Sequence, residues 1–196
     1  MKLWAIVAIV VSCIFIGLLF YSFTVKNIET PKYRVIKTLG EVEIREYPGL
    51  VLAQTTLKKP DYDNEGNQGF RTVAGYIFGG NQTQQKIAMT APVIMRMGDS
   101  ASMSFVMPSK YSIKDLPAPS NREVKLVQED AKILAVIRFG GYSNTEKIKQ
   151  FADKLFVELK QNNLATRGDV LYMGYNAPWD VINRRNEVAI ELVGLE

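Results

Sequence analysis

The segment KIAMTAPVIMRM, residues 86–97, brings three methionines together in a chain that contains no histidine. A methionine thioether can ligate haem iron, or it can fill irregular space in a hydrophobic core. Alternate residues of a strand face opposite sides, so Met89, Met95 and Met97 would share one apolar face. A haem-ligating methionine also needs a second axial ligand, and no histidine is present to supply it. We therefore interpret these methionines as core residues that line the interior of a barrel.

The residue types that common catalytic sites require are missing. With no histidine and with Cys13 as the single cysteine, the chain has no Ser-His or Cys-His pair and no zinc site of the ordinary type. The segment GGNQ, residues 79–82, lacks the GK[ST] ending of a phosphate-binding loop. No spacing points to paired carboxylates, although the sequence leaves a buried pair open. We expect a binding protein without catalytic residues or a metal site, rather than an enzyme.

An uncharged, largely apolar run extends from Leu3 to Val25. At about 1.5 Å per residue, a helix of this length crosses a hydrocarbon core roughly 30 Å thick. We predict an N-terminal transmembrane anchor over residues 1–26, a linker over 27–32 and one domain over 33–196. A cleavable signal peptide is the alternative, but no small-x-small cleavage site closes the run. Cys13 would be a buried side chain of this membrane helix.

The side of the membrane is read from the flanking charges. One lysine precedes the run and four basic residues follow it within residues 26–37, a count that favours a cytoplasmic domain. A short N-terminus with a single lysine is also how a signal anchor begins. We expect a single-pass, membrane-anchored protein with an extracytoplasmic domain, in a bacterium. The net charge of +4 is small and dispersed, which argues against a nucleic-acid partner.

The rest of the chain reads as short strands interrupted by two helices. Residues 41–45, EVEIR, alternate charged and apolar side chains, which predicts a strand with one face in water. Helical spacing of apolar residues predicts helices within 69–80 and 143–163, the second capped by Ser143 or Asn144. Strands are expected in residues 33–57 (three of them), 86–97, 103–108, 124–130, 132–142, 169–179 and 186–193.

The order of these elements recurs along the domain. Strand pair, helix, strand ending in Ala-Pro and strand occur once around Ala91-Pro92 and again around Ala177-Pro178. A duplicated ββαβ-type unit would join two half-sheets into a barrel-like or saddle-shaped sheet, with both helices on one side.

Seven segments occur in the order known from one family. They are REYPG, GFRTVAGYIFGGN, KIAMTAPV, PAPSN, VIRFGGY, GDVLYMGYNAPW and RRNEV. With these segments the domain resembles the SOUL/haem-binding-protein family from about Tyr33 to the C-terminus. The resemblance implies an α+β fold: a distorted antiparallel β-barrel from a duplicated ββαβ-type unit, flanked by two helices.

The same resemblance implies non-covalent binding of haem, a related tetrapyrrole or another flat hydrophobic ligand. The implied site is a patch on the first helix, capped by the loop between the last two strands. By position it comprises Gln68, Arg71, Thr72, Gly75, Tyr76, Trp179 and Asp180. Arg71 would pair with a propionate, and Tyr76 and Trp179 would stack on the macrocycle. Asp180 would repel a propionate.

Haem in such a site would be held by burial and stacking, or by Tyr, Lys or Met ligation. Against this reading, Tyr76 and Trp179 could simply cover the end of the barrel, and Arg71 could be a solvated helix residue. RRNEV, residues 184–188, is expected to be structural, with one arginine paired to a carboxylate. Two other functions remain open: a small-molecule domain of the multidrug-sensor or hydrolase type, and a protein-interaction module that uses the same patch.

Overall fold

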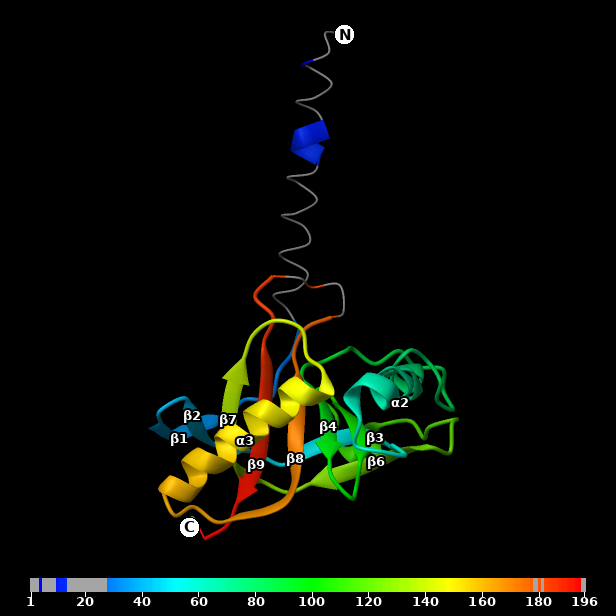
Figure 1. Cartoon of the computed structure of the whole chain (residues 1–196). Helices are drawn as coiled ribbons and strands as arrows, with labels where there is room; N and C mark the ends of the chain where they lie inside the picture. The colour runs from blue at the N-terminus through cyan, green and yellow to red at the C-terminus, as the bar shows by residue number, and fades with distance from the viewer. Residues whose placement is uncertain (1–3, 5–9, 14–27, 178–179, 181, 195–196) are drawn as a thin grey trace.

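The computed structural model describes residues 4, 10–13, 28–177, 180 and 182–194. In this part of the chain, nine strands form one antiparallel sheet with the order β1-β2-β7-β9-β8-β4-β5-β3-β6 (Figure 1). The strands are β1 (Arg34–Leu39), β2 (Val42–Tyr47), β3 (Leu50–Thr56), β4 (Val93–Met97), β5 (Ser102–Val106), β6 (Val124–Glu129), β7 (Lys132–Phe139), β8 (Thr166–Gly174) and β9 (Asn186–Leu192). The helices are α2 (Tyr62–Ile77), α3 (Thr145–Gln161) and the short 3-10 helix η1 (Ile113–Asp115).

The expected distorted antiparallel β-barrel is wrong, because the described sheet is open. β1 pairs with β2 and β6 pairs with β3, and these two outer strands are the edges of the described sheet. The edge strand β1 is exposed, with Val35 and Ile36 at 46% and 44%, and its register shifts between Val35 and Lys37. A bulge and charged side chains on an edge strand hinder pairing with another strand, so the sheet ends here instead of closing.

The recurring unit also differs from the expected ββαβ. The structure places strand, helix, strand and strand in the order β3-α2-β4-β5 and again in the order β7-α3-β8-β9. In the sheet these strands are arranged β3-β5-β4 and β7-β9-β8, on either side of the β4–β8 pair. Two strands precede each helix along the chain, as expected, but they are not neighbours in the sheet: β2 pairs with β7, and β6 pairs with β3.

The expected transmembrane helix and the membrane-anchored location are corrected. Among the described residues, no helix combines the length and the apolar character that spanning a bilayer requires. Of the expected anchor, residues 1–26, only residues 4 and 10–13 are described, and the rest lies outside the described part. The structure gives the anchor no support, and the proposals below make no use of it.

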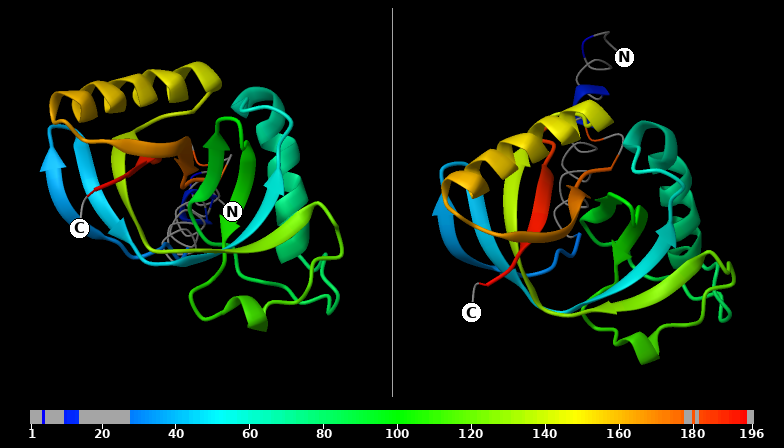
Figure 2. Two further views of the ribbon diagram at one scale, coloured as in Figure 1. Left: turned by 90° about the horizontal axis from the view of Figure 1, so that it is seen from below. Right: turned by 60° about the horizontal axis from the view of Figure 1, so that its bottom comes forward.

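Both long helices lie on the same, outer face of the curved sheet (Figure 2). α3 covers β7 and β9, and α2 covers β3 and β5. The helix expected within 143–163 is confirmed as α3: the Asn144 side chain caps it, accepting from the Lys147 amide at 2.8 Å. Its apolar stripe of Ile148, Ala152 and Leu155 is buried against the sheet.

The first helix, α2, begins at Tyr62, seven residues before the segment in which it was expected, residues 69–80. The Asp61 side chain accepts from the amides of Asp63 and Asn64 and so caps α2 at Tyr62. Its first two turns, residues 62–69, have the sequence YDNEGNQG, in which Tyr62 is the only apolar residue. The helical pattern of apolar residues starts only at Phe70, so sequence periodicity could not locate this half of the helix.

The methionines of residues 86–97 do not share one environment. Met95 is fully buried in the core between the sheet and the helices, and Met97 packs against that core. Met89, in contrast, is 36% exposed. β4 begins only at Val93, so the strict alternation expected for the whole segment does not extend back to Met89. The core interpretation is confirmed for Met95 and Met97 and wrong for Met89.

Candidate functional site

A hollow of about 310 Å³ lies on the helix-covered side of the sheet, between α2 and the connections that precede α3 and β9. We call it the α2 cleft. Its lining residues are Tyr62, Asp63, Gly66, Asn67, Phe70, Val93, Met95, Met103, Tyr142, Tyr172, Gly174, Asn176 and Arg184. Small-molecule sites in proteins have this character, with an apolar floor, aromatic walls and a few polar groups.

Aromatic side chains form much of the wall of the α2 cleft. The rings of Tyr62 and Tyr172 meet edge to face with centroids 5.0 Å apart. The Tyr172 hydroxyl donates to Asn186 Oδ1 at 2.8 Å and lies 3.0 Å from Ser143 Oγ. Burial raises the pKa of Tyr172, and the neighbouring Tyr62 adds to the shift. Tyr172 is therefore a fixed, neutral phenol, whereas the ring of Tyr142 is 57% exposed and available for stacking.

Arg184 is the cation that lines the α2 cleft. Its Nη1 donates to the carbonyl oxygens of Ala177 at 2.9 Å and Asp180 at 2.6 Å, and its guanidinium lies 4.4 Å from the ring centre of Tyr142. Its Nε is buried and has no hydrogen-bond partner among the described residues. Two carbonyls thus hold the guanidinium in place without neutralising its charge, and a planar guanidinium suits a carboxylate.

The helix residues expected at the site lie on different sides of α2. Arg71, Gly75 and Gln68 are exposed and Thr72 is partly exposed; their spacing places them on one face, away from the residues that line the cleft. Tyr76 is 1% exposed in the core under α2, and its hydroxyl donates to the Pro117 carbonyl at 3.0 Å. Burial raises the pKa of Tyr76 to about 12.

The loop residues expected at the site are described in part. Trp179 lies outside the described residues. The Asp180 carboxylate accepts from the Ala177 amide at 3.1 Å and so takes part in the turn that positions the Arg184 contacts. The loop between β8 and β9 therefore does approach α2. Its residues Asn176 and Arg184 line the α2 cleft together with the first half of that helix.

Sequence reasoning missed most of the residues that line the cleft. Tyr62 and Asn67 fall in the polar stretch of α2 that showed no apolar period. Tyr142 and Arg184 belong to two of the segments that resemble the family, but their spacing did not distinguish them from neighbouring residues as candidates for ligand binding. A signal was available at two places: Tyr142 is the aromatic residue that ends VIRFGGY, residues 136–142, and Arg184 is one of the two arginines that precede NEV, residues 186–188.

The opposite face of the sheet carries charges that are buried. Glu187 is 0% exposed, and its carboxylate accepts from Arg45 Nη1 at 2.9 Å, Arg185 Nε at 2.9 Å and the Tyr175 hydroxyl at 2.8 Å. Burial opposes the charge on Arg45, but Glu187, with Tyr47 and Glu43, outweighs it and raises the pKa of Arg45. The arginine–carboxylate pair expected in RRNEV is thus confirmed.

The expected water-exposed face of residues 41–45 is wrong at Arg45, which is only 3% exposed. The alternation along β2 is real, but the face that carries Arg45 turns toward Glu187, 142 residues away in the sequence. Alternation alone reports which residues share a face, and it cannot report a distant carboxylate that covers that face.

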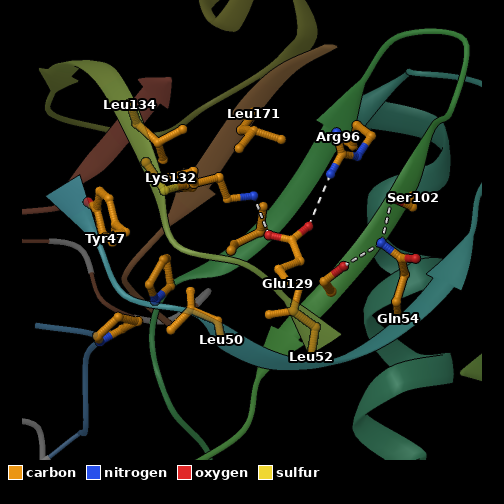
Figure 3. A pocket seen from close by; sticks show the side chains of 15 residues that line it. Tyr47, Leu50, Leu52, Gln54, Arg96, Ser102, Glu129, Lys132, Leu134 and Leu171 are labelled. Carbon is orange, nitrogen blue, oxygen red and sulfur yellow. Dashed lines mark hydrogen bonds and ion pairs between the residues drawn. The ribbon is translucent and has the colours of Figure 1, made fainter. Parts of the chain in front are cut away.

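A second hollow on this face is narrow and lined mostly by apolar residues (Figure 3). We call it the concave chamber; its free volume is about 20 Å³. It is lined by Pro31, Tyr47, Leu50, Leu52, Gln54, Pro92, Ile94, Arg96, Ser102, Ser104, Glu129, Lys132, Leu134, Leu171 and Met173. Glu129 binds both Arg96, at 3.2 Å, and Lys132, and Gln54 Nε2 donates to the hydroxyls of Ser102 and Ser104 at 3.1 Å each.

Metal ligation finds no support in the described residues, where no group of three or more His, Cys, Asp or Glu side chains gathers. The α2 cleft offers aromatic side chains and a guanidinium, groups that can contact a flat ring and a carboxylate. The sulfurs of Met95 and Met103 belong to side chains that are 0% and 3% exposed, and no imidazole exists in the chain.

Comparisons with known proteins agree on one family. A family model described as SOUL heme-binding protein matches residues 28–191. Heme-binding protein 2 of Mus musculus is 30% identical over 159 residues, covering 76% of this chain and 77% of the relative. Heme-binding protein 2 of Homo sapiens is 29% identical over 175 residues, covering 82% and 84%. These vertebrate relatives give no support to the bacterial source expected from the sequence.

Two solved structures share the fold. The EcmrR C-terminal domain superposes with a TM-score of 0.60 at 8% identity, covering 83% of this chain and 99% of that one. A structure described as a hydrolase from Listeria innocua gives 0.54 at 9% identity, covering 80% and 94%. At such low identity these likenesses concern the fold alone. The family model covers most of the chain and the mouse relative covers more than two thirds of it, so the chain belongs to the SOUL heme-binding protein family.

Proposed function

We propose that the chain binds haem, or a related flat tetrapyrrole, non-covalently in the α2 cleft. The observation that carries the proposal is the position of Arg184. Its guanidinium is fixed by two backbone carbonyls, keeps a buried Nε without a partner in the described residues, and stands beside the exposed ring of Tyr142. The family and the names of its relatives supply the ligand class.

The cleft residues have separable roles in this proposal. Tyr142 and Tyr62 stack on or flank the faces of the macrocycle, because aromatic rings pack well in offset or edge-to-face arrangements. Phe70, Val93 and the buried methionines form the apolar floor. Arg184 binds a propionate carboxylate. Haem iron would supply the group's redox and ligand chemistry, while these residues bind and orient the ring and exclude water from one side of it.

The volume of the cleft bears on the mode of binding. At about 310 Å³ it lies at the lower end of the range for small-molecule sites, so part of a tetrapyrrole would remain outside. A shallow site of this kind suits reversible binding. The chain acts in this proposal as a binding protein and not as a catalyst.

The test is a titration of the full chain with hemin, followed by absorbance. We expect Arg184→Gln to weaken binding about tenfold, the size of a lost charge-assisted hydrogen bond. Tyr142→Ala should weaken it by several fold through lost stacking. Arg71→Gln, which removes an exposed arginine from the outer face of α2, should change the affinity by less than twofold.

The comparison between the two arginine variants decides where the ligand binds. A loss with Arg184→Gln alone supports the α2 cleft. A loss with Arg71→Gln alone supports instead the exposed face of α2 that carries Gln68, Thr72 and Gly75. If neither variant changes the affinity, arginine-assisted binding is refuted both in the α2 cleft and on the exposed face of α2.

A further inference from the structure

The walls of the concave chamber suit an aliphatic group. Leu52 comes from β3, Leu134 from β7, and Leu171 and Met173 from β8, so the apolar wall is built from both halves of the sheet. The free volume of about 20 Å³ is room for about one water molecule. A larger guest therefore has to be narrow, and it has to widen the chamber where the two halves meet.

The Glu129 bridge lies where such widening would occur. Glu129 ends β6, Arg96 lies on β4 and Lys132 begins β7. β6 and β4 are separated in the sheet by β5 and β3, and β7 belongs to the other half. The Glu129–Arg96 pair thus joins β6 to β4, which share no backbone ladder, whereas the Glu129–Lys132 pair spans the short turn between β6 and β7; Figure 3 shows both contacts.

A polar hollow of about 310 Å³ adjoins the chamber at the bridge. We call this hollow the vestibule. Arg96, Glu129, Lys132, Leu134 and Leu171 line both spaces. A polar entrance that leads to an apolar interior matches the two ends of an amphiphile, with its head group at the bridge and its body among the leucines.

The charges at the bridge select the head group. The two cations and one carboxylate of the bridge sum to one positive charge, and all three side chains are largely buried, at 27%, 14% and 17% exposure. An incoming carboxylate would share the donors of Arg96 and Lys132 and neutralise this charge, whereas a cation would be repelled.

Other vestibule charges lie further out and are paired or solvated. Arg167 pairs with Glu191 at 2.5 Å, and Asp169 accepts from the Ser100 amide at 3.3 Å. Asp130 is exposed at the β6–β7 turn. Water and salt screen the exposed charges of Arg167 and Asp130, and Glu191 and Asp169 are engaged by Arg167 and by the Ser100 amide, so we expect the bridge to decide the choice of ligand.

We propose that the concave chamber is a second ligand site, for a small amphiphile with one carboxylate and an aliphatic body, and that the Glu129 bridge is its gate. The site lies on the face of the sheet opposite the α2 cleft and does not depend on haem binding. The ligand carboxylate replaces Glu129 as a partner of Arg96 and Lys132, and the chain enters between Leu134 and Leu171.

The two faces carry their own reporters, so the test can tell the sites apart. Met173 lines the concave chamber, whereas Met95 and Met103 line the α2 cleft. With ¹³C-methyl methionine in the full chain, titration with octanoate should shift the Met173 methyl resonance saturably and leave Met95 and Met103 in place. Octylammonium, with the same chain length and the opposite charge, should give no shift at Met173.

Two variants of the Glu129 bridge should change the affinity for octanoate in opposite directions. Arg96→Gln should weaken octanoate binding about tenfold, because a charged partner of the carboxylate is lost. Glu129→Gln should strengthen binding by several fold, because the competing carboxylate is removed. Arg122→Gln removes an exposed arginine that is not among the lining residues of the chamber or of the vestibule; it is the matched control and should have no effect.

Each of three results would overturn the proposal. They are an unchanged Met173 resonance at saturating octanoate, equal binding of octylammonium, and octanoate affinities that do not respond to Arg96→Gln and Glu129→Gln. A shift of Met95 and Met103 instead of Met173 would assign octanoate to the α2 cleft, and would equally refute a site in the chamber.

Discussion

Arg184 and Arg185 are neighbours in the sequence but lie on opposite faces of the sheet. Arg185 turns to the face without helices, where Glu187 and the hydroxyl of Tyr33 receive its donors. Arg184 turns to the α2 cleft, where, within the part of the chain that the structure describes, it donates to two backbone carbonyls and lies over the ring of Tyr142. One arginine is neutralised by a carboxylate within the described chain and the other keeps its charge at an open hollow. The first arrangement holds the fold together, and the second is suited to a ligand.

The largest effect should come from breaking the neutralised arrangement. Glu187→Gln removes the buried carboxylate that Arg45 and Arg185 share and leaves Arg45 with Glu43 as its remaining charged partner, and we expect it to lower the free energy of unfolding by about 3–5 kcal/mol. Urea unfolding of the variant and of the unaltered chain measures the difference.

The control for this change lies on the same strand. Glu191 pairs with Arg167, whose side chain is 67% exposed, so Glu191→Gln should cost less than about 1 kcal/mol. If the two glutamate variants lose the same stability, the distinction between the buried cluster and a surface pair fails.

This contrast also shows how far the sequence could lead. The apolar stripe of α3 follows from spacing alone, because residues three or four apart on a helix share a face. For RRNEV the sequence predicted that one arginine pairs with a carboxylate, without identifying that carboxylate. The sequence could not say which of the two arginines would pair. That depends on the direction in which β9 faces, and the buried partner Arg45 is contributed by β2.

The site was harder to predict than the fold for a related reason. The cleft-lining half of α2 is polar in sequence, and its glycines gave no sign of a packed surface. The expected residues from Gln68 to Gly75 came from the family resemblance; they lie on α2, but on a different face from the cleft, and their role in binding stays a prediction. The open edges of the sheet likewise depend on pairings between distant strands, which local patterns do not reveal.

Two glycines of α2 allow the packed side of that helix to be compared with its exposed side. A Cβ on Gly69 would lie 2.7 Å from Leu57 Cδ2 and 3.2 Å from Met103 Cβ, whereas a Cβ on Gly75 would meet nothing within 4 Å. We expect Gly69→Ala to destabilise the chain by about 1–3 kcal/mol through overpacking. Gly75→Ala should stabilise it by about 0.5–1 kcal/mol, because alanine favours the helix interior.

Thermal or urea unfolding of both alanine variants reads out this difference in sign. Equal effects would mean that helix propensity outweighs packing at Gly69. The Gly75 variant also serves the ligand question, since a loss of hemin affinity without a loss of stability would place the ligand on the outer face of α2.

The smallest effect concerns two tyrosines on opposite faces, and it appears only at high pH. Burial raises the pKa of Tyr172 on the helix side and of Tyr175 on the other face, where the charge of Glu187 adds to the shift. The folded state then keeps both protons at a pH where the unfolded chain, with a tyrosine pKa near 10, releases them.

Stability from this source is complete below about pH 10 and is lost as the pH rises above it, by up to about 1.4 kcal/mol per pH unit for each tyrosine. Tyr172→Phe and Tyr175→Phe should each flatten the fall in the free energy of unfolding above pH 10, measured with urea. In a Glu187→Gln background the slope assigned to Tyr175 should begin to level off at lower pH than before, and that of Tyr172 should not move; a change in both would show that the two faces are electrostatically coupled.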